Sequence, residues 1–176
     1  MQEVVVITGP IGSGKSSVAS KLANRFNDAG RTVAVVDVDE IVAMLRVPPE
    51  DAKWTWETAR TPHGRLVGEW LSAGVDAVIA HGPFHSRIDD ANLMRHIPSE
   101  VATRRVMLLA TYEVALNRVK SDPSRGLSRD PTFLASTYEV FNQRLPEIEP
   151  CEWTFDTSIC SVDDVVTTLA DALIRT

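Results

Sequence analysis

The hydrophobic positions of the chain follow two alternating patterns. Between short apolar runs, hydrophobic residues recur at helical spacing, as at Val18, Leu22 and Phe26. Short runs rich in β-branched residues are typical of strands that are buried on both faces of a parallel sheet. We therefore predict five strands that alternate with helices. The predicted strands cover residues 4–8, 32–38, 75–80, 105–110 and 153–156.

Residues that favour helix ends mark the predicted boundaries. Gly30 ends the first helix, because glycine readily adopts the left-handed conformation found there. Asp130 as N-cap and Pro131 at the first helical position open a later helix. An irregular stretch with Trp54 and Trp56 follows the second helix. The other predicted helices cover residues 40–46, 66–73, 112–121 and 162–174.

This order of elements predicts an α/β fold with a doubly wound parallel sheet and helices on both faces. A chain of 176 residues, 44% hydrophobic and 24% charged, is long enough for one well-packed core and short for two. We therefore expect a single domain over residues 1–176. Ligands of such sheets bind at the C-terminal ends of the strands, so functional residues are expected there.

Charge and cysteine content narrow the function classes. A net charge of -6 disfavours general nucleic-acid binding, which needs a basic surface. No apolar run is long enough to cross a bilayer, and no targeting pattern is visible. Cys151 and Cys160 lack companions for a zinc site, which favours a reducing compartment. We expect a cytoplasmic protein without nucleic-acid or membrane partners, and the sequence indicates no oligomeric state.

Residues 9–16 read Gly-Pro-Ile-Gly-Ser-Gly-Lys-Ser and match the phosphate-binding loop, or P-loop. Successive backbone N–H groups of such a loop surround a phosphate, and its glycines let the backbone approach closely. Lys15 would reach the outer phosphates, and the Ser16 hydroxyl would bind Mg²⁺. The same letters also occur in accidental turns. Here they follow a buried strand and open an amphipathic helix, which favours a P-loop.

Kinases, GTPase switches and ATP-driven motors share the P-loop. A guanine-specific switch would carry Asn-Lys-x-Asp after a late strand, whereas residues 117–120 read Asn-Arg-Val-Lys. The third strand ends in Ala-His-Gly, without the acidic residue that many ATPases place there. These observations favour a kinase that uses ATP and Mg²⁺. The predicted loop contacts are Gly9, Pro10, Ile11, Gly12, Ser13, Gly14, Lys15, Ser16 and Ser17.

Two carboxylates, Asp37 and Asp39, lie at the end of the second predicted strand. The carboxyl end of this strand lies at the same sheet edge as the P-loop. We assign Mg²⁺ orientation to Asp37 and acceptance of the hydroxyl proton to Asp39, although which carboxylate is the base stays open. The competing interpretation is that one of them, Asp39 above all, only caps the next helix.

Basic residues gather between positions 118 and 129 of this otherwise acidic chain. We predict a basic lid over residues 121–130 that closes on the triphosphate, with Arg125 as its catalytic arginine because Gly126 permits hinging. Arg144, near the end of the following helix, would reach the same phosphates. The competing interpretation is an ordinary solvated loop.

With these motifs, the chain resembles P-loop small-molecule kinases of the shikimate kinase, gluconate kinase and chloramphenicol phosphotransferase type, over its whole length. The resemblance implies a three-layer P-loop NTPase fold with strand order 2-3-1-4-5. It further implies that Arg118 packs on adenine and that the turn Phe155-Asp156-Thr157-Ser158 lines the base from the other side. It also implies that Asp39 is the catalytic base.

The segments that would bind the phosphate acceptor differ from shikimate kinases. Those enzymes have a glycine run after the third strand, whereas residues 81–85 read His-Gly-Pro-Phe-His. The acceptor-binding region is expected over about residues 40–70, and whether His81 or His85 contacts the acceptor stays open. The side chains expected to surround the acceptor are Trp54, Trp56, Arg60, Arg65, Phe84 and His85; core packing is an equal alternative for the tryptophans.

The sequence thus predicts a Mg²⁺-dependent phosphotransferase that moves the γ-phosphoryl group of ATP to a hydroxyl of a small metabolite or antibiotic. Its partner would be that small-molecule acceptor. The alternative is a regulatory nucleotide-binding ATPase that transfers nothing to an acceptor, because a P-loop fold does not fix function.

Overall fold

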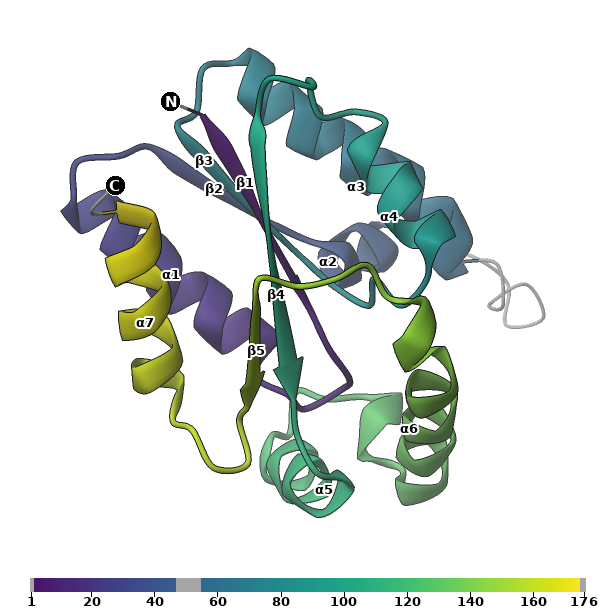
Figure 1. Cartoon of the computed structure of the whole chain (residues 1–176). Coiled ribbons are helices and arrows are strands. Elements are labelled where there is room, and N and C mark those ends of the chain that lie inside the picture. The colour runs from purple at the N-terminus through teal and green to yellow at the C-terminus, as the bar shows by residue number, and fades with distance from the viewer. Residues whose placement is uncertain (1, 47–54, 175–176) are drawn as a thin grey trace.

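The computed structural model describes residues 2–46 and 55–174. It contains a five-stranded parallel sheet with the strand order β2-β3-β1-β4-β5, so the expected fold and strand order are confirmed. β1 is the central strand, and β2 and β5 form the two edges (Figure 1). The strands are β1 (Glu3–Thr8), β2 (Val33–Asp37), β3 (Ala77–His81), β4 (Ala102–Leu109) and β5 (Trp153–Asp156).

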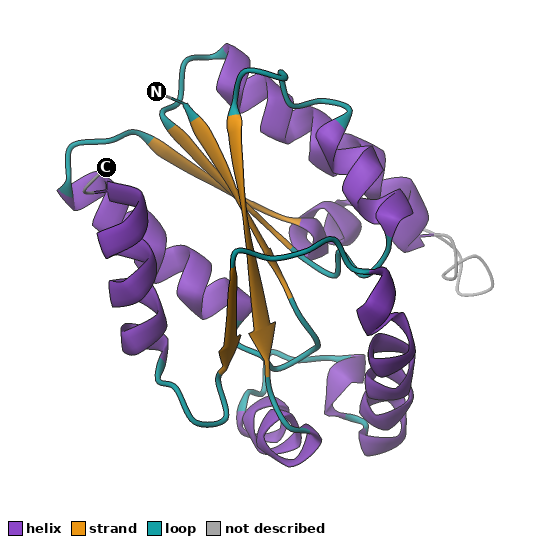
Figure 2. Ribbon diagram, viewed as in Figure 1, coloured by secondary structure: helices purple, strands orange, loops and turns teal. Residues whose placement is uncertain are grey.

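Helices cover both faces of the sheet (Figure 2). α1 and α7 lie on one face and α3 and α4 on the other, whereas α5 and α6 lie at the C-terminal ends of the strands (Figure 1). None of the described helices is both long and apolar enough to cross a membrane. The helices are α1 (Lys15–Asp28), α2 (Val38–Met44), α3 (Thr55–Ser72), α4 (Arg87–Met94), α5 (Tyr112–Ser121), α6 (Pro131–Arg144) and α7 (Val162–Ile174).

The central strand divides the core into two halves. Side chains of successive strand residues point to opposite faces. Val5 and Ile7 accordingly pack in the cluster that includes α1 and α7, whereas Val4 and Val6 pack in the cluster that includes α3. All four are at most 3% exposed. The continuous apolar run therefore fixes β1 in the middle of the sheet, directly before the P-loop.

The pairing register determines which residues meet at the C-terminal edge of the sheet. Asp37 of β2 pairs with His81 of β3, and His81 pairs with Ile7 of β1. β1, β2 and β3 end within a residue of one another at this edge, whereas β4 and β5 extend two residues beyond the level of Thr8. The P-loop continues from Thr8. The register therefore places Asp37 and His81 beside the P-loop.

α3 and α4 differ most from the sequence-based prediction, and α2 starts two residues earlier than predicted. α3 begins at Thr55, so Trp56 is helical and not in an irregular stretch. His63 is among its buried residues, and Pro62 lies inside the helix. Because neither residue is typical of an apolar helical face, the helical spacing of hydrophobic residues was not recognised there. α4 was not predicted at all, because it is short and polar; its N-terminus is capped by the Ser86 side chain.

The third strand also ends later than predicted, because it includes His81. The imidazole of His81 is 3% exposed. A buried polar residue at a strand end reads in sequence as the start of a turn, which is why the predicted strand stopped at residue 80.

Candidate active site

The P-loop lies between β1 and α1, and its glycines are required by close contacts. Gly12 has a φ of 77°, and a Cβ atom there would lie 2.9 Å from the Cβ of Ala115 on α5. A Cβ on Gly9 would overlap the carbonyl oxygen of Leu108 at the end of β4. Gly14, with a φ of 91°, is the N-cap of α1. Gly9 and Gly12 are therefore needed for packing as well as for backbone conformation, whereas Gly14 is needed for backbone conformation alone.

Side chains from several elements bind the carbonyl groups of the loop. Lys15 Nζ donates to the carbonyl oxygens of Gly9 and Pro10 at 2.8 and 2.9 Å. Three further donors come from α6, α5 and the turn after β5, and each contacts a different loop carbonyl. They are Tyr138 Oη to Ile11 at 3.0 Å, Arg118 Nη1 to Gly12 at 2.9 Å and Thr157 Oγ1 to Ser13 at 3.0 Å.

The N–H side of the loop offers a site for an anion. No side chain caps the N-terminus of α1, so the N–H groups of its first turn and the positive end of the helix dipole are available to a ligand. Ser16 and Ser17 are exposed in this turn. The hydroxyl of Ser13 is buried and has no hydrogen-bond partner among the described residues. These features suit a bound phosphate.

Asp37 and Asp39 lie at the C-terminal end of β2. Asp37 Oδ1 accepts a hydrogen bond from the backbone N–H of Asp39 at 2.9 Å and is the N-cap of α2. The alternative that Asp39 is the capping residue is therefore wrong, because the helix starts earlier than predicted. Asp39 lies in the first turn of α2 and is exposed. Its carboxylate is consequently free of the capping role.

The surroundings raise the pKa of both carboxyl groups. Desolvation is the main cause of both increases. The charge of Asp37 raises the pKa of Asp39 further. The Lys15 charge lowers the pKa of both carboxyl groups. Desolvation lowers the pKa of Lys15 to about 8, against the opposing effect of Asp39 and Asp37. The charge of Arg125 also acts on all three groups. Lys15, Asp37 and Asp39 thus lie close enough for their charges to act on one another, and the Arg125 charge acts on all three.

His81 is a buried neighbour of this charged cluster. Its Nδ1 lies 3.5 Å from Asp37 Oδ1. Desolvation, followed by the Lys15 charge, lowers the pKa of His81 to about 4, whereas the Asp39 charge acts to raise it. His81 is therefore neutral at pH 7 and adds no charge beside the two carboxylates.

The lid residues take part in local contacts. Arg125 Nε lies 3.3 Å from Asp122 Oδ2, and the lid contains a short 3-10 helix, η2 (Leu127–Arg129). Arg144 is exposed at the end of α6, and its charge acts on His85. These two arginines therefore approach the site from α6 and from the segment that precedes it.

Arg118 and Thr157, expected beside adenine, form one hydrogen-bonded group. Besides its bond to Gly12, Arg118 donates to Thr157 Oγ1 and to the Thr157 carbonyl oxygen, at 2.9 and 2.6 Å. The two residues thus join α5, the turn after β5 and the P-loop. Their proposed contact with the base stays a prediction.

A family comparison agrees with this geometry. The AAA domain family matches residues 4–130, which is more than half of the 176 residues. The chain belongs to the AAA domain family. No curated protein matches the chain.

Solved structures with the fold of this AAA domain include several small-molecule kinases. Shikimate kinase from Acinetobacter baumannii is 17% identical, with a TM-score of 0.65, and the match covers 99% of this chain and 94% of that one. Shikimate kinase from Bacteroides thetaiotaomicron is 17% identical (TM-score 0.70; 97% and 98% covered). A gluconokinase from Sinorhizobium meliloti 1021 is 20% identical (TM-score 0.62; 98% and 92% covered). The AAA domain therefore has the P-loop kinase fold.

The expected acceptor-binding side chains of the AAA domain do not form one group. Phe84 is 6% exposed and belongs to the hydrophobic core. Trp56 is 39% exposed on α3, and Arg65 is exposed on the same helix. Trp54 lies outside the described residues. Of the described members of this set, Phe84 is a core residue, and the contact of the others with an acceptor stays a prediction.

Arg60 and His85 instead meet at a buried carboxylate. Arg60 Nε lies 2.7 Å from Asp89 Oδ1, although the hydrogen-bond angle is poor, and Asp89 is 1% exposed. The backbone N–H of His85 donates to Asp89 Oδ2 at 3.0 Å, and its ring Nε2 lies 3.3 Å from the Gly9 carbonyl oxygen. A carbonyl only accepts, so Nε2 carries the proton. Asp89 thus connects α3 to the P-loop through His85.

Sequence reasoning missed Tyr138 and Asp89. Tyr138 was not among the predicted site residues, and Asp89 lies on α4, the helix that was not predicted. An acid within a polar segment, or a tyrosine in a helical apolar stripe, carries no signal of its partner, because that partner is distant in sequence. The separation is 127 residues for Tyr138 and Ile11.

Proposed function

We propose that the protein is an ATP-dependent phosphotransferase that moves a γ-phosphoryl group to a hydroxyl of a small molecule. The observation that supports this most is the mutual electrostatic influence of Lys15, Asp37, Asp39 and Arg125 at the mouth of the P-loop. Two cations that can bind transferring phosphate and two carboxylates that can serve Mg²⁺ and a proton are the groups that phosphoryl transfer requires.

The loop fits a nucleotide triphosphate. The uncapped N-terminus of α1 and the unpartnered Ser13 hydroxyl would face its phosphates. Lys15 would exchange its two carbonyl acceptors for phosphate oxygens, a change between hydrogen-bonding partners. ATP supplies the transferable phosphoryl group. The fold of P-loop kinases supports the assignment of a nucleotide to this position.

Mg²⁺ would be held by few protein groups. Among residues 2–46 and 55–174, no group of three or more His, Cys, Asp or Glu side chains could hold a metal ion. This fits Mg²⁺, which keeps several waters and binds through one or two carboxylates and substrate phosphates. Ser16 and Asp37 are the proposed protein contacts. The metal would neutralise phosphate charge during transfer.

Asp39 is the proposed base. The acceptor oxygen forms a bond to the γ-phosphorus while the bond from that phosphorus to the β,γ-bridging oxygen breaks, and ADP leaves. Asp39 takes the proton of the acceptor hydroxyl. Desolvation raises the pKa of Asp39, which makes its carboxylate a stronger base. Arg125 would bind the transferring group after the lid closes and excludes water.

The acceptor is proposed to be a small hydroxyl compound, either a metabolite or an antibiotic. Similar structures are those of shikimate kinases and a gluconokinase, one of them in complex with shikimate. Those names suggest polar alcohols as the first compounds to test. The rival proposal, a regulatory ATPase, predicts ADP release that no acceptor stimulates.

The test is an acceptor screen that measures ADP release, followed by the Asp39→Asn variant. We expect a stimulating alcohol, and a turnover that falls about 10²- to 10⁴-fold in the variant, as for loss of a general base. ATP affinity should be retained. Glu40→Gln is the matched control, since Glu40 is an exposed acid on the same helix. Turnover that is equal in both variants would remove Asp39 from the mechanism, and ADP release without any acceptor effect would favour the ATPase.

A further inference from the structure

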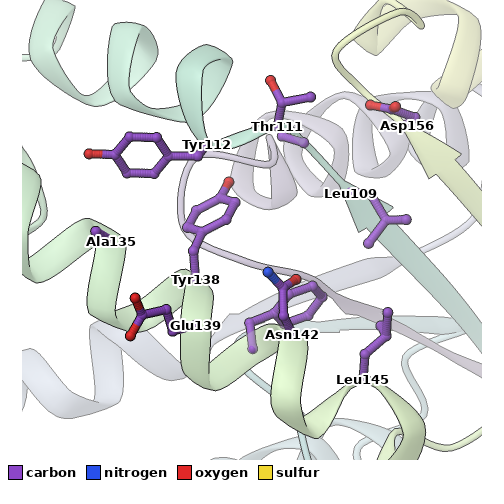
Figure 3. A pocket seen from close by; sticks show the side chains of 11 residues that line it. Leu109, Thr111, Tyr112, Ala135, Tyr138, Glu139, Asn142, Leu145 and Asp156 are labelled. Atoms are coloured by element: carbon purple, nitrogen blue, oxygen red, sulfur yellow. The ribbon is translucent and has the colours of Figure 1, made fainter.

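A cavity lies next to the P-loop, on the side towards β5, and Tyr138, which donates to the Ile11 carbonyl, is part of its lining. It has a volume of about 500 Å³ and lies between α6 and the C-terminal ends of β4 and β5 (Figure 3). β5 and β2 are opposite edges of the sheet, so this cavity and Asp39 lie on opposite sides of the P-loop strand. None of residues 9–16 and neither of the two catalytic-site carboxylates lines it.

The cavity borders the expected nucleotide site, because Asp156 directly precedes Thr157 in the turn that the resemblance places beside the base. Neither Arg118 nor Thr157, two other expected neighbours of adenine, lines it. Thr111, at the N-terminus of α5, does line it, but its side chain already accepts from the Val114 N–H at 3.3 Å. The cavity volume is in the range of known small-molecule sites. We therefore asked which ligand chemistry its lining suits.

The lining combines aromatic rings with carboxylates. Tyr112, Tyr138 and Phe141 contribute rings, and Tyr112 and Tyr138 contact each other edge to face at 5.9 Å between centroids. Glu139 and Asp156 lie on opposite sides of the opening (Figure 3). Among the described residues that line the cavity, none is a lysine, arginine or histidine. The two carboxylates of the lining therefore favour a cation over an anion.

We propose that this cavity is a second ligand site, which binds a small organic cation with a flat apolar body. Aromatic faces attract cations and also bury flat apolar groups. Glu139 and Asp156 would attract the positive end. Asp156 is oriented by its own contact, because its Oδ1 accepts from the Ser158 N–H at 2.8 Å. The proposal goes beyond the proposed phosphoryl transfer and does not depend on it.

Three probes of one shape test the charge requirement. Benzamidine is a flat cation, benzamide its neutral counterpart and benzoate its anionic one. Titrated against the full chain by protein NMR, benzamidine should bind about tenfold more tightly than benzamide, a difference typical of one favourable charge interaction. Benzoate should not bind. Chemical shift changes should centre on α6 and the end of β5.

Glu139→Gln should reduce the preference for benzamidine over benzamide by about threefold or more, as for loss of one charge. Glu69→Gln is the matched control, because Glu69 is an exposed helical glutamate outside the cavity, and it should retain the full preference. Equal binding of benzamide, or the same loss in both variants, would overturn the proposal. Displacement of benzamidine by ATP would also overturn it, because the cavity would then belong to the nucleotide site.

Discussion

Lys15 illustrates how burial and function are connected at a single residue. Its ammonium group is held by two carbonyl oxygens of its own loop, and desolvation lowers its pKa to about 8. It remains largely protonated at pH 7. The charge costs stability in the free protein, and a bound polyphosphate would compensate for it.

We expect Lys15→Ala to abolish detectable ATP binding, measured with a fluorescent nucleotide, because the remaining N–H groups lack a compensating cation. Lys21→Ala is the control on the same helix. Lys21 forms an exposed ion pair with Asp163 at 2.7 Å, and exposed pairs contribute about 1 kcal/mol or less. If Lys15→Ala bound ATP as tightly as the unmodified protein does, the assignment of a nucleotide to the P-loop would be contradicted.

His63 carries a pH-dependent part of the stability. It is 1% exposed, and its Nε2 lies 3.0 Å from the Val36 carbonyl oxygen. Desolvation lowers its pKa to about 4 from 6.5, so between these pH values the unfolded state binds more protons than the folded state. Its imidazole therefore lowers stability as the pH falls from 6.5 to 4. The full cost, on the order of 3 kcal/mol, applies below pH 4.

His63→Gln should flatten this pH dependence, because glutamine can keep the N–H donor but does not titrate. The measurement is urea unfolding at several pH values between 4 and 7. We expect the fall in unfolding free energy towards pH 4 to be smaller in the variant than in the unmodified protein. Parallel curves for the two proteins would show that His63 is not the source.

At the scale of elements, α6 is joined to the P-loop by two residues one turn apart. Tyr138 donates to the Ile11 carbonyl, and burial raises its pKa to about 12, so the hydroxyl stays a donor. Phe141 packs edge to face on His85 at 5.0 Å between centroids, and His85 in turn donates to the Gly9 carbonyl. The helix that follows the predicted lid thus contacts the P-loop.

Tyr138→Phe should weaken ATP binding by about three- to tenfold, the usual effect of one hydrogen bond, because the Ile11 carbonyl loses its donor and the loop is less well positioned. Tyr112→Phe is the matched control. Its hydroxyl bonds to the Pro131 carbonyl at 3.2 Å and does not contact the loop, so ATP affinity should be unchanged. Equal affinities in the two variants would contradict a positioning role for Tyr138.

At the scale of the whole molecule, the lid at residues 121–130 has few contacts with the core. Arg125 pairs with Asp122 of the same segment, and Leu127 is 67% exposed. Exposed segments of this kind open at low free-energy cost and are cleaved first by proteases. Ligand binding that closes the lid should therefore protect it.

We expect ATP with Mg²⁺ to slow tryptic cleavage after Arg125 and Arg129 by about threefold or more, because only the closed lid is shielded. The cleavage rate is followed by mass spectrometry. Lys15→Ala should show no protection. If ATP also slowed cleavage of Lys15→Ala, or did not slow cleavage of the unmodified protein, the lid would not respond to nucleotide binding.

The contribution of sequence and structure can be compared at particular elements. Periodicity placed β1 and α1 correctly, because each depends on its own residues, and the P-loop between them is a contiguous motif. The strand order 2-3-1-4-5, expected from the family resemblance, is confirmed. α3 was predicted only in part, because Pro62 and His63 interrupt its apolar pattern. α4 was not predicted, because its sequence is short and polar. Tertiary packing stabilises both helices.

The sequence by itself determined the fold class, the P-loop and the two aspartates after β2, because local pattern and contiguous motifs suffice for these. The tertiary structure alone decided that Asp37 rather than Asp39 caps α2, that His81 is buried and neutral, and that Tyr138 contacts Ile11. It also decided where the cavity between α6 and β5 lies. Such properties depend on desolvation and on contacts between segments far apart in the chain, which pairing register and packing establish only when the whole molecule folds.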